Sequence, residues 1–301
     1  MTPRVLDRSR PLCAEEAAER GDPLPGTASR ISGWLLVEYG GHWPYEPLDA
    51  TVFAGGLRER LAAQLAEVAG SRLFLVKRPG EGRRDRVAVL YGTTPGRFRR
   101  FELATHGGLM ELDLVAMLRD GEGPGDPVGH PLLLVCAHGV RDRCCAKYGQ
   151  ELCRNLSGLA PEGWVWQTSH VGGDRFAGNL VVLPEGLFFG RVGREEAPRV
   201  LGSYLEGRID LGCYRGRSAD PFPVQAAEAA VRERTGLIGF HDLRATARHS
   251  LGDGVSEVEF LAEVSGETYR VRVERRLGEP RLLTCRAKEP RPPRSFDVTF
   301  L

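Results

Sequence analysis

Residues 131–149, PLLLVCAHGVRDRCCAKYG, and residues 169–179, SHVGGDRFAGN, decide both the fold and the chemistry of this chain. Each segment is typical of a buried strand that runs into a loop rich in metal-binding side chains. Cys136, Cys145, His170 and Asp174 lie in these two loops. If the strands are neighbours in one sheet, the four side chains meet in one small volume. A soft metal or an iron–sulfur cluster needs thiolates and imidazole brought together from separate segments in this way.

The composition is that of a soluble globular protein. The chain has 301 residues, of which 42% are hydrophobic and 27% are charged, with a net charge of +1. Such a balanced charge argues against a nucleic acid or an acidic membrane as a partner. No apolar run approaches the roughly 20 residues that span a bilayer, and no apolar signal-peptide core opens the chain. We therefore expect a cytoplasmic protein without membrane insertion, and the sequence leaves the oligomeric state open.

The cysteines are numerous and clustered. There are seven of them, and an odd number in a large chain argues against a secreted disulfide framework. Four fall between positions 136 and 153. In a reducing compartment such clustering favours metal or redox chemistry. The seven are Cys13, Cys136, Cys144, Cys145, Cys153, Cys213 and Cys285.

Two consecutive segments follow one order of elements. A polar lead-in covers residues 1–30, a first unit covers residues 31–120, and a second unit covers residues 130–210, after a Gly/Pro-rich stretch at 120–129. Apolar periodicity predicts strand, helix, three strands and helix in each unit. In the first unit these are 34–40, 57–70, 72–79, 83–92, 98–105 and 111–121; in the second they are 131–139, 144–158, 165–173, 179–186, 187–192 and 196–208. We therefore predict an α/β fold of duplicated thioredoxin-like units, with the metal site in the second.

Residues 211–301 have a different character and predict a small α+β segment. A turn-rich loop at 212–223 precedes an Ala-rich helix at 224–236 that ends on a glycine. Alternation around a Ser-Gly turn predicts a β-hairpin at 258–277. Two further strands are expected at 281–288 and 295–301. No chemistry is expected in this segment.

The spacing of the candidate ligands limits the kind of metal. Eight residues separate Cys136 from Cys145, which is too many for the tight cysteine pair of a usual zinc knuckle. Cys145 lies at a helix start, where the dipole and free N–H groups stabilise a thiolate. Gly172 and Gly173 would let the backbone pass close to a bulky ligand. The alternative is that Cys136 and Cys153 are small core residues and that His170 is a hydrogen-bonded loop histidine.

Three separated motifs resemble the sucrase/ferredoxin-like family. They are CAHGVRDRCCAKYG at 136–149, HVGGDRFAGNLVVLPEGLFFGRV at 170–192, and YRGRS with PFPVQAAEAA at 214–230. The resemblance spans roughly residues 25–235. The resemblance implies a thioredoxin-like ferredoxin, since the family is related to such ferredoxins. The better-known fungal members of the family carry a 2Fe–2S cluster. The family pattern is Cys-x8-Cys followed by His-x-Gly-Gly-His, and it assigns Cys136, Cys145 and His170 as cluster ligands.

This chain departs from the family pattern at one ligand position. The second histidine is replaced by Asp174, so that the motif reads HVGGD. A carboxylate ligand would add negative charge and lower the reduction potential of the cluster. Three outcomes are open: Asp174 binds the metal, His138 or Cys144 completes the site, or the cluster is absent.

We expect an electron carrier rather than an enzyme. It would pass one electron between a 2Fe–2S cluster and an unidentified redox protein partner. The alternatives are a metal-free thiol oxidoreductase that uses Cys144 or Cys145, and a binding or scaffold protein without a cluster. His138 is expected to donate a hydrogen bond to the loop backbone, and Cys144 to point into the core. Cys13 and Cys285 receive no role, and Arg215 and Arg217 are expected to be solvated.

Overall fold

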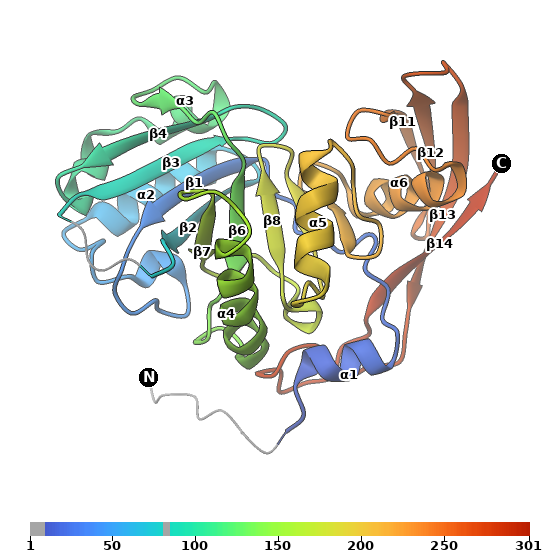
Figure 1. Cartoon of the computed structure of the whole chain (residues 1–301), viewed down its shortest axis with the longest axis horizontal. Coiled ribbons are helices and arrows are strands. Elements are labelled where there is room, and N and C mark those ends of the chain that lie inside the picture. The colour runs from blue at the N-terminus through green and yellow to red at the C-terminus, as the bar shows by residue number, and fades with distance from the viewer. Residues whose placement is uncertain (1–9, 81–84) are drawn as a thin grey trace.

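Two β-sheets with six flanking helices make up the part of the chain that is described. The computed structural model describes residues 10–80 and 85–301. Residues 1–9 of the expected lead-in and 83–84 of the third expected strand lie outside this range. One sheet has ten strands and the other has four, and Figure 1 shows the smaller sheet at the C-terminal end of the molecule.

The ten-stranded sheet contains both predicted units. Its strand order is β10-β9-β8-β6-β7-β2-β1-β3-β4-β5. The first half is built from β1 Gly33–Glu38, β2 Ser71–Lys77, β3 Val87–Thr93, β4 Phe98–Leu103 and the two-residue β5 Asp126–Pro127. The second is built from β6 Leu132–Cys136, β7 Val165–Thr168, β8 Leu180–Leu183, β9 Leu187–Phe189 and β10 Tyr214–Arg217. The helices between them are α2 Leu57–Glu67, α3 Leu114–Arg119, α4 Arg143–Ser157 and α5 Glu196–Leu205.

The two halves pair their strands in the same way. β1 is parallel to β2 and antiparallel to β3, and β6 is likewise parallel to β7 and antiparallel to β8. The halves meet where β2 runs antiparallel to β7, with Val76 opposite Thr168 and Lys77 opposite Gln167. The order strand, helix, three strands, helix therefore occurs in both halves, as expected. The assignment of duplicated thioredoxin-like units stays a prediction.

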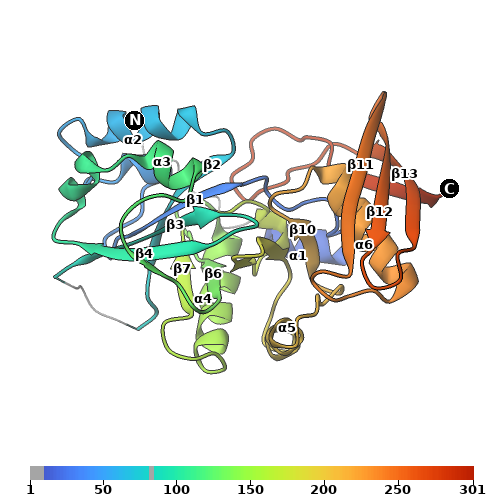
Figure 2. The ribbon, with the colours of Figure 1, turned by 90° about the horizontal axis from the view of Figure 1, so that it is seen from above.

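The strands β1 and β6 each divide their side chains between two apolar clusters, because successive residues point to opposite faces of a sheet. Leu35 and Val37 of β1 face the cluster under α2 and α3. Leu133 and Val135 of β6 face the cluster under α4 and α5. Figure 2 shows the two helix pairs on opposite sides of the large sheet. The intervening residues of both halves join a third cluster, which includes Cys136 and Cys145, so the expected ligands lie at the meeting point of the two units.

The segment after position 210 does not begin a separate unit. β10 adds to the large sheet beside β9. The helix α6 Phe222–Thr235 then covers the small sheet of β11 Leu243–Gly252, β12 Val255–Ala262, β13 Thr268–Leu277 and β14 Arg294–Phe300. The strand expected at 281–288 is wrong: that stretch makes a single bridge, between Arg281 and Arg291. The expected lead-in contains α1 Cys13–Glu19, a short helix without a side-chain cap.

A buried ionic group joins β10 to α6. The carboxylate of Glu228 accepts hydrogen bonds from the Tyr214 hydroxyl at 2.6 Å, from Arg217 at 3.1 Å and from Arg232 at 2.9 Å. Arg217, which was expected to be solvated, is therefore an ion-pair partner. Burial works to raise the pKa of Glu228, but Arg217 and Arg232 outweigh it and lower the pKa to about 2.

This network predicts acid-sensitive stability. The pKa of Glu228 is depressed on folding, so its contribution is complete above pH 4.5 and is lost as the pH falls towards 2. Glu228→Gln should lower the free energy of unfolding at pH 7 by about 3 kcal/mol, because it leaves two buried guanidinium groups without their counter-charge. Urea unfolding between pH 2 and 7 measures the effect. Glu233→Gln, on the exposed face of α6, is the matched control, and an equal loss in both variants would contradict the prediction.

Candidate metal centre

Two parallel strands bring the expected ligands to one edge of the sheet. β6 and β7 are hydrogen-bonded neighbours, with Cys136 opposite Thr168 at their carboxyl ends. The loop after β6 leads into α4, whose N-cap is Asp142. The loop after β7 carries His170 and Asp174. The chain therefore delivers thiols from one loop and an imidazole and a carboxylate from the next.

The structure brings Cys136, Cys145, His170 and Asp174 together. The His170 Nδ1 atom lies 3.9 Å from the sulfur of Cys136 and 3.9 Å from that of Cys145. The Asp174 Oδ1 atom lies 3.3 Å from the Cys145 sulfur and 3.1 Å from His170 Nδ1. Both cysteines are fully buried, and the side chains of His170 and Asp174 are 14% and 8% exposed. Two soft sulfurs, one nitrogen and one oxygen converge here, which is a donor set suited to a soft or borderline metal.

A glycine in α4 sets the distance between the helix and β6. A Cβ at Gly149 would overlap the backbone carbonyl of Cys136. The helix can therefore rest directly on the end of the strand only because residue 149 has no side chain. This close approach carries Cys145, one turn earlier in the helix, to Cys136. The glycine was part of the quoted motif, but its spacing gave no signal of this contact.

A buried arginine holds the loop that carries His170. The Arg215 guanidinium, 1% exposed, donates to the Gly172 carbonyl at 3.1 Å, to Asn179 Oδ1 at 2.7 Å and to the Thr27 carbonyl at 2.5 Å. Gly173 has a φ of 86°, and a Cβ there would overlap the guanidinium. The loop glycine is thus needed to pack against Arg215. The expectation that Arg215 is solvated is wrong, and its burial identifies a positioning residue that the sequence did not reveal.

The two alternate ligands point elsewhere. The His138 Nδ1 atom accepts a hydrogen bond from the His170 backbone N–H at 3.2 Å, so His138 accepts from the loop backbone rather than donating to it. Its ring also packs edge-on against Trp43. Cys144 turns away from Cys145 and lies 3.5 Å from the sulfur of Cys13. Neither residue shares the group formed by Cys136, Cys145 and His170.

Contacts within the site shift its pKa values in opposite directions. The hydrogen bond from Cys145 holds the pKa of the Cys136 thiol well below its usual value, against burial and with help from His170. Burial lowers the pKa of His170, but Cys136 and Asp174 outweigh it, and the net pKa is raised. Burial raises the pKa of Asp174, and the charge of His170 offsets part of the rise. Cys136 is therefore favoured as a thiolate, the form that binds metals.

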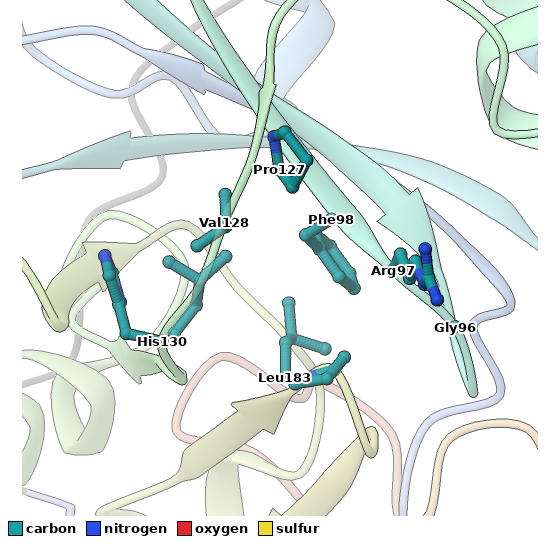
Figure 3. A pocket seen from close by; sticks show the side chains of 9 residues that line it. Gly96, Arg97, Phe98, Pro127, Val128, His130 and Leu183 are labelled. Atoms are coloured by element: carbon teal, nitrogen blue, oxygen red, sulfur yellow. The ribbon is translucent and has the colours of Figure 1, made fainter.

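His170 connects the site to the protein surface. This residue lines an open groove of about 590 Å³, together with Tyr45, Glu46, Asp49, Arg72 and Arg141. A second hollow, of about 250 Å³, lies between the start of β4 and the end of β8. Figure 3 shows that Phe98, Pro127, Val128 and Leu183 line this second hollow. Its lining contains none of the four converging residues, whereas the groove at His170 borders the candidate metal centre.

The fold and the site together define an α/β protein with a buried thiol, imidazole and carboxylate group at the end of two parallel strands. The chain belongs to the sucrase/ferredoxin-like family, whose sequence model matches residues 24–216. The match ends inside β10 and leaves out most of the C-terminal segment. The resemblance in the motifs is therefore confirmed at the level of the family.

Curated relatives match only part of the chain. It is 32% identical over 106 residues to "Altered inheritance of mitochondria protein 32" of Eremothecium gossypii, a match that covers 31% of this chain and 34% of that protein. It is 35% identical over 98 residues to the protein of the same name of Meyerozyma guilliermondii, covering 28% and 34%. The chain thus spans about a third of the length of these relatives. No solved structure matches it significantly. None of the helices in residues 10–80 and 85–301 is long and apolar enough to cross a membrane.

The close contact at Gly149 predicts that one added methyl group at this position lowers the stability of the fold. Gly149→Ala should lower the free energy of unfolding by about 2 kcal/mol or more, because helix and strand must separate. Gly202→Ala in α5 is the control: its Cβ would meet no atom within 4 Å, so it should be neutral or stabilise by up to about 1 kcal/mol. Urea unfolding compares the two variants. Equal stability of both would show that α4 does not depend on this contact.

Proposed function

We propose that this protein is a one-electron carrier that holds a 2Fe–2S cluster at Cys136, Cys145, His170 and Asp174. In this proposal its large sheet consists of two thioredoxin-like units, and only the second carries the cluster. The observation that carries the proposal is the convergence of two buried thiols, an imidazole and a carboxylate from two neighbouring loops.

The donor set suits such a cluster. A 2Fe–2S cluster takes four protein ligands, and histidine replaces cysteine at some clusters of this kind. The site offers four donors, of which the thiol of Cys136 already has a lowered pKa. When bound, the cluster supplies the capacity to take up and release a single electron.

The surrounding residues support electron transfer in three ways. The protein buries the sulfurs of Cys136 and Cys145 and the carboxylate of Asp174, so water is largely excluded from these donors. The buried guanidinium of Arg215 places a positive charge near Cys136, Asp174 and Cys145, since these three groups favour its charged form while burial lowers its pKa to about 9. His170 connects the site to the groove, where a redox protein partner could approach within electron-transfer distance.

The rival thiol chemistry has less support. A metal-free thiol oxidoreductase that uses Cys144 or Cys145 as its nucleophile needs that sulfur to reach a substrate. Both side chains are fully buried, and they belong to different groups of donors. If the protein is colourless and iron-free and one of its cysteines is alkylated rapidly, that result would favour the metal-free thiol oxidoreductase.

Iron and sulfide analysis of the anaerobically purified protein tests the proposal. We expect about two irons and two sulfides per chain and a visible spectrum that bleaches with dithionite. Cys136→Ser and Cys145→Ser should each remove the colour. Cys153→Ser is the matched control, because Cys153 is buried on the same helix but faces the α5 side of the core. Colour retained in both ligand variants would refute the assignment, as would a protein that resists reconstitution.

Asp174 should tune the reduction potential. Asp174→His restores the family motif and removes one negative charge from the ligand set, so the potential should rise by on the order of 100 mV. Potentiometric titration followed by electron paramagnetic resonance measures this shift. An unchanged potential and spectrum would show that Asp174 is not a ligand.

A further inference from the structure

A second group of sulfurs lies at the start of α4, on the side away from Cys145. The Cys144 sulfur lies 3.5 Å from that of Cys13 and 3.5 Å from that of Cys285, and the last two are 3.7 Å apart. All three residues are buried, with exposures of 4%, 0% and 7% for Cys13, Cys144 and Cys285. They come from α1, from α4 and from the connection between β13 and β14.

Ordinary packing or a disulfide explains this group poorly. A disulfide needs a sulfur separation of about 2.05 Å, so none of the three pairs is bonded. Cys13 and Cys285 are 272 positions apart in the chain, and neither belongs to the large core clusters. They share a small cluster with Leu12, Ala14 and Ala177. The short helix α1 and the irregular connection between β13 and β14 thus each place a thiol at the start of α4.

The spacing of the sulfurs fits a single metal ion. A triangle with sides of 3.5, 3.5 and 3.7 Å places each sulfur about 2.1 Å from its centre. Since a Zn–S bond is about 2.3 Å, an ion bonded to all three would lie about 1 Å out of their plane, close to its place in a tetrahedral site. The fourth position then faces away from the triangle and is free for an oxygen donor.

We propose that Cys13, Cys144 and Cys285, with the carboxylate of Asp142, form a structural zinc site. Asp142 Oδ1 lies 3.9 Å from the Cys13 sulfur, and its donor atom lies within 4.8 Å of all three sulfurs. Three thiolates and one carboxylate complete a closed tetrahedral shell, which is the pattern of structural rather than catalytic zinc.

Hydrogen bonds already orient these ligands. The two oxygens of Asp142 accept from the backbone N–H groups of Cys144 and Cys285, each at 2.8 Å. The Ala14 N–H donates to the Cys144 sulfur at 3.4 Å. Such outer contacts fix the ligands of metal sites and favour the thiolate form. The N-terminal end of the 15-residue helix α4 adds a partial positive charge.

A bound zinc ion would link the segment around Cys13 and the segment around Cys285 to α4. Figure 1 shows α1 beside the connection that precedes β14, and the contacts of Cys13 and Cys285 with Cys144 place both segments at the start of α4. Hydrogen bonds also join these segments: Arg10 donates to the Ala287 carbonyl at 3.1 Å, Arg143 donates to the Arg10 carbonyl at 3.0 Å, and the Tyr148 hydroxyl donates to the Glu15 carboxylate at 2.6 Å. A cross-link between distant parts of a chain restricts the unfolded state, so the ion would stabilise the fold without taking part in electron transfer.

Metal counting on the full chain tests the proposal. The protein is produced in medium with added zinc and iron, and both metals are measured by plasma mass spectrometry. We expect about one zinc ion per chain, with zinc reduced at least tenfold in Cys285→Ser and in Cys13→Ser. Cys213→Ser, a buried cysteine in the α5 core, is the control and should retain zinc.

Variants of the first site separate this proposal from the electron-carrier proposal. Cys136→Ser should keep its zinc whatever happens to its iron, because Cys136 is not a member of the second group. Zinc that is absent from the wild-type protein, or that is retained in folded Cys285→Ser, would overturn the proposal. So would a loss of iron and sulfide, instead of zinc, in that variant.

A readout on the wild-type protein covers the case in which the variants fail to fold. Alkylation of the native protein, followed by peptide mapping, should leave Cys13, Cys144 and Cys285 protected. Removal of zinc with a chelator should expose these three together and lower the melting temperature, and added zinc should reverse both effects. Labelling that is the same before and after chelation would overturn the proposal.

Discussion

The buried guanidinium of Arg215 is the interaction on which the arrangement of the candidate metal centre depends. Its hydrogen bonds reach Thr27 in the N-terminal segment, Gly172 in the His170 loop and Asn179 before β8. A charge enclosed by protein is costly unless each of its donors has a partner. The three segments are therefore held in one arrangement, because any displacement would leave part of the guanidinium without hydrogen bonds. The same group supplies positive charge beside the thiols, so structural support and electrostatic balance come from one side chain.

Local patterns in the sequence were enough to predict most elements of the large sheet. Apolar runs such as Leu132–Cys136 are buried on both faces and mark strands regardless of what lies beside them. The convergence of Cys136 and His170 also followed from sequence, because neighbouring parallel strands end at the same edge. The identity of the group as a metal centre does not follow from this convergence and stays a prediction, as do the duplicated thioredoxin-like units.

Features that depend on distant partners could not be predicted. The short helix α1 buries only the small side chains of Cys13, Ala14 and Ala17, and its position depends on contacts with the loop around Asp174 and with α4. Arg215 lies in β10, within a sequence that predicted a turn-rich loop, and only the folded chain shows that Thr27 and Asn179 surround it. The convergence of Cys13 and Cys285 on Cys144 was missed for the same reason, since no spacing rule connects residues 272 positions apart.

The adjacent cysteines at the start of α4 have one further consequence, which concerns the order in which the chain is synthesised. The residues that Cys145 contacts, Cys136, His170 and Asp174, all lie with it in one continuous stretch of sequence. The neighbouring residue Cys144 contacts Cys13, which is synthesised before it, and Cys285, which is synthesised much later. On the ribosome the first group of donors is therefore complete while one thiol of the second is still missing. Until the late segment emerges and folds back, Cys144 and Cys13 are an open pair, available to chaperones, oxidants or metal donors that the finished protein excludes.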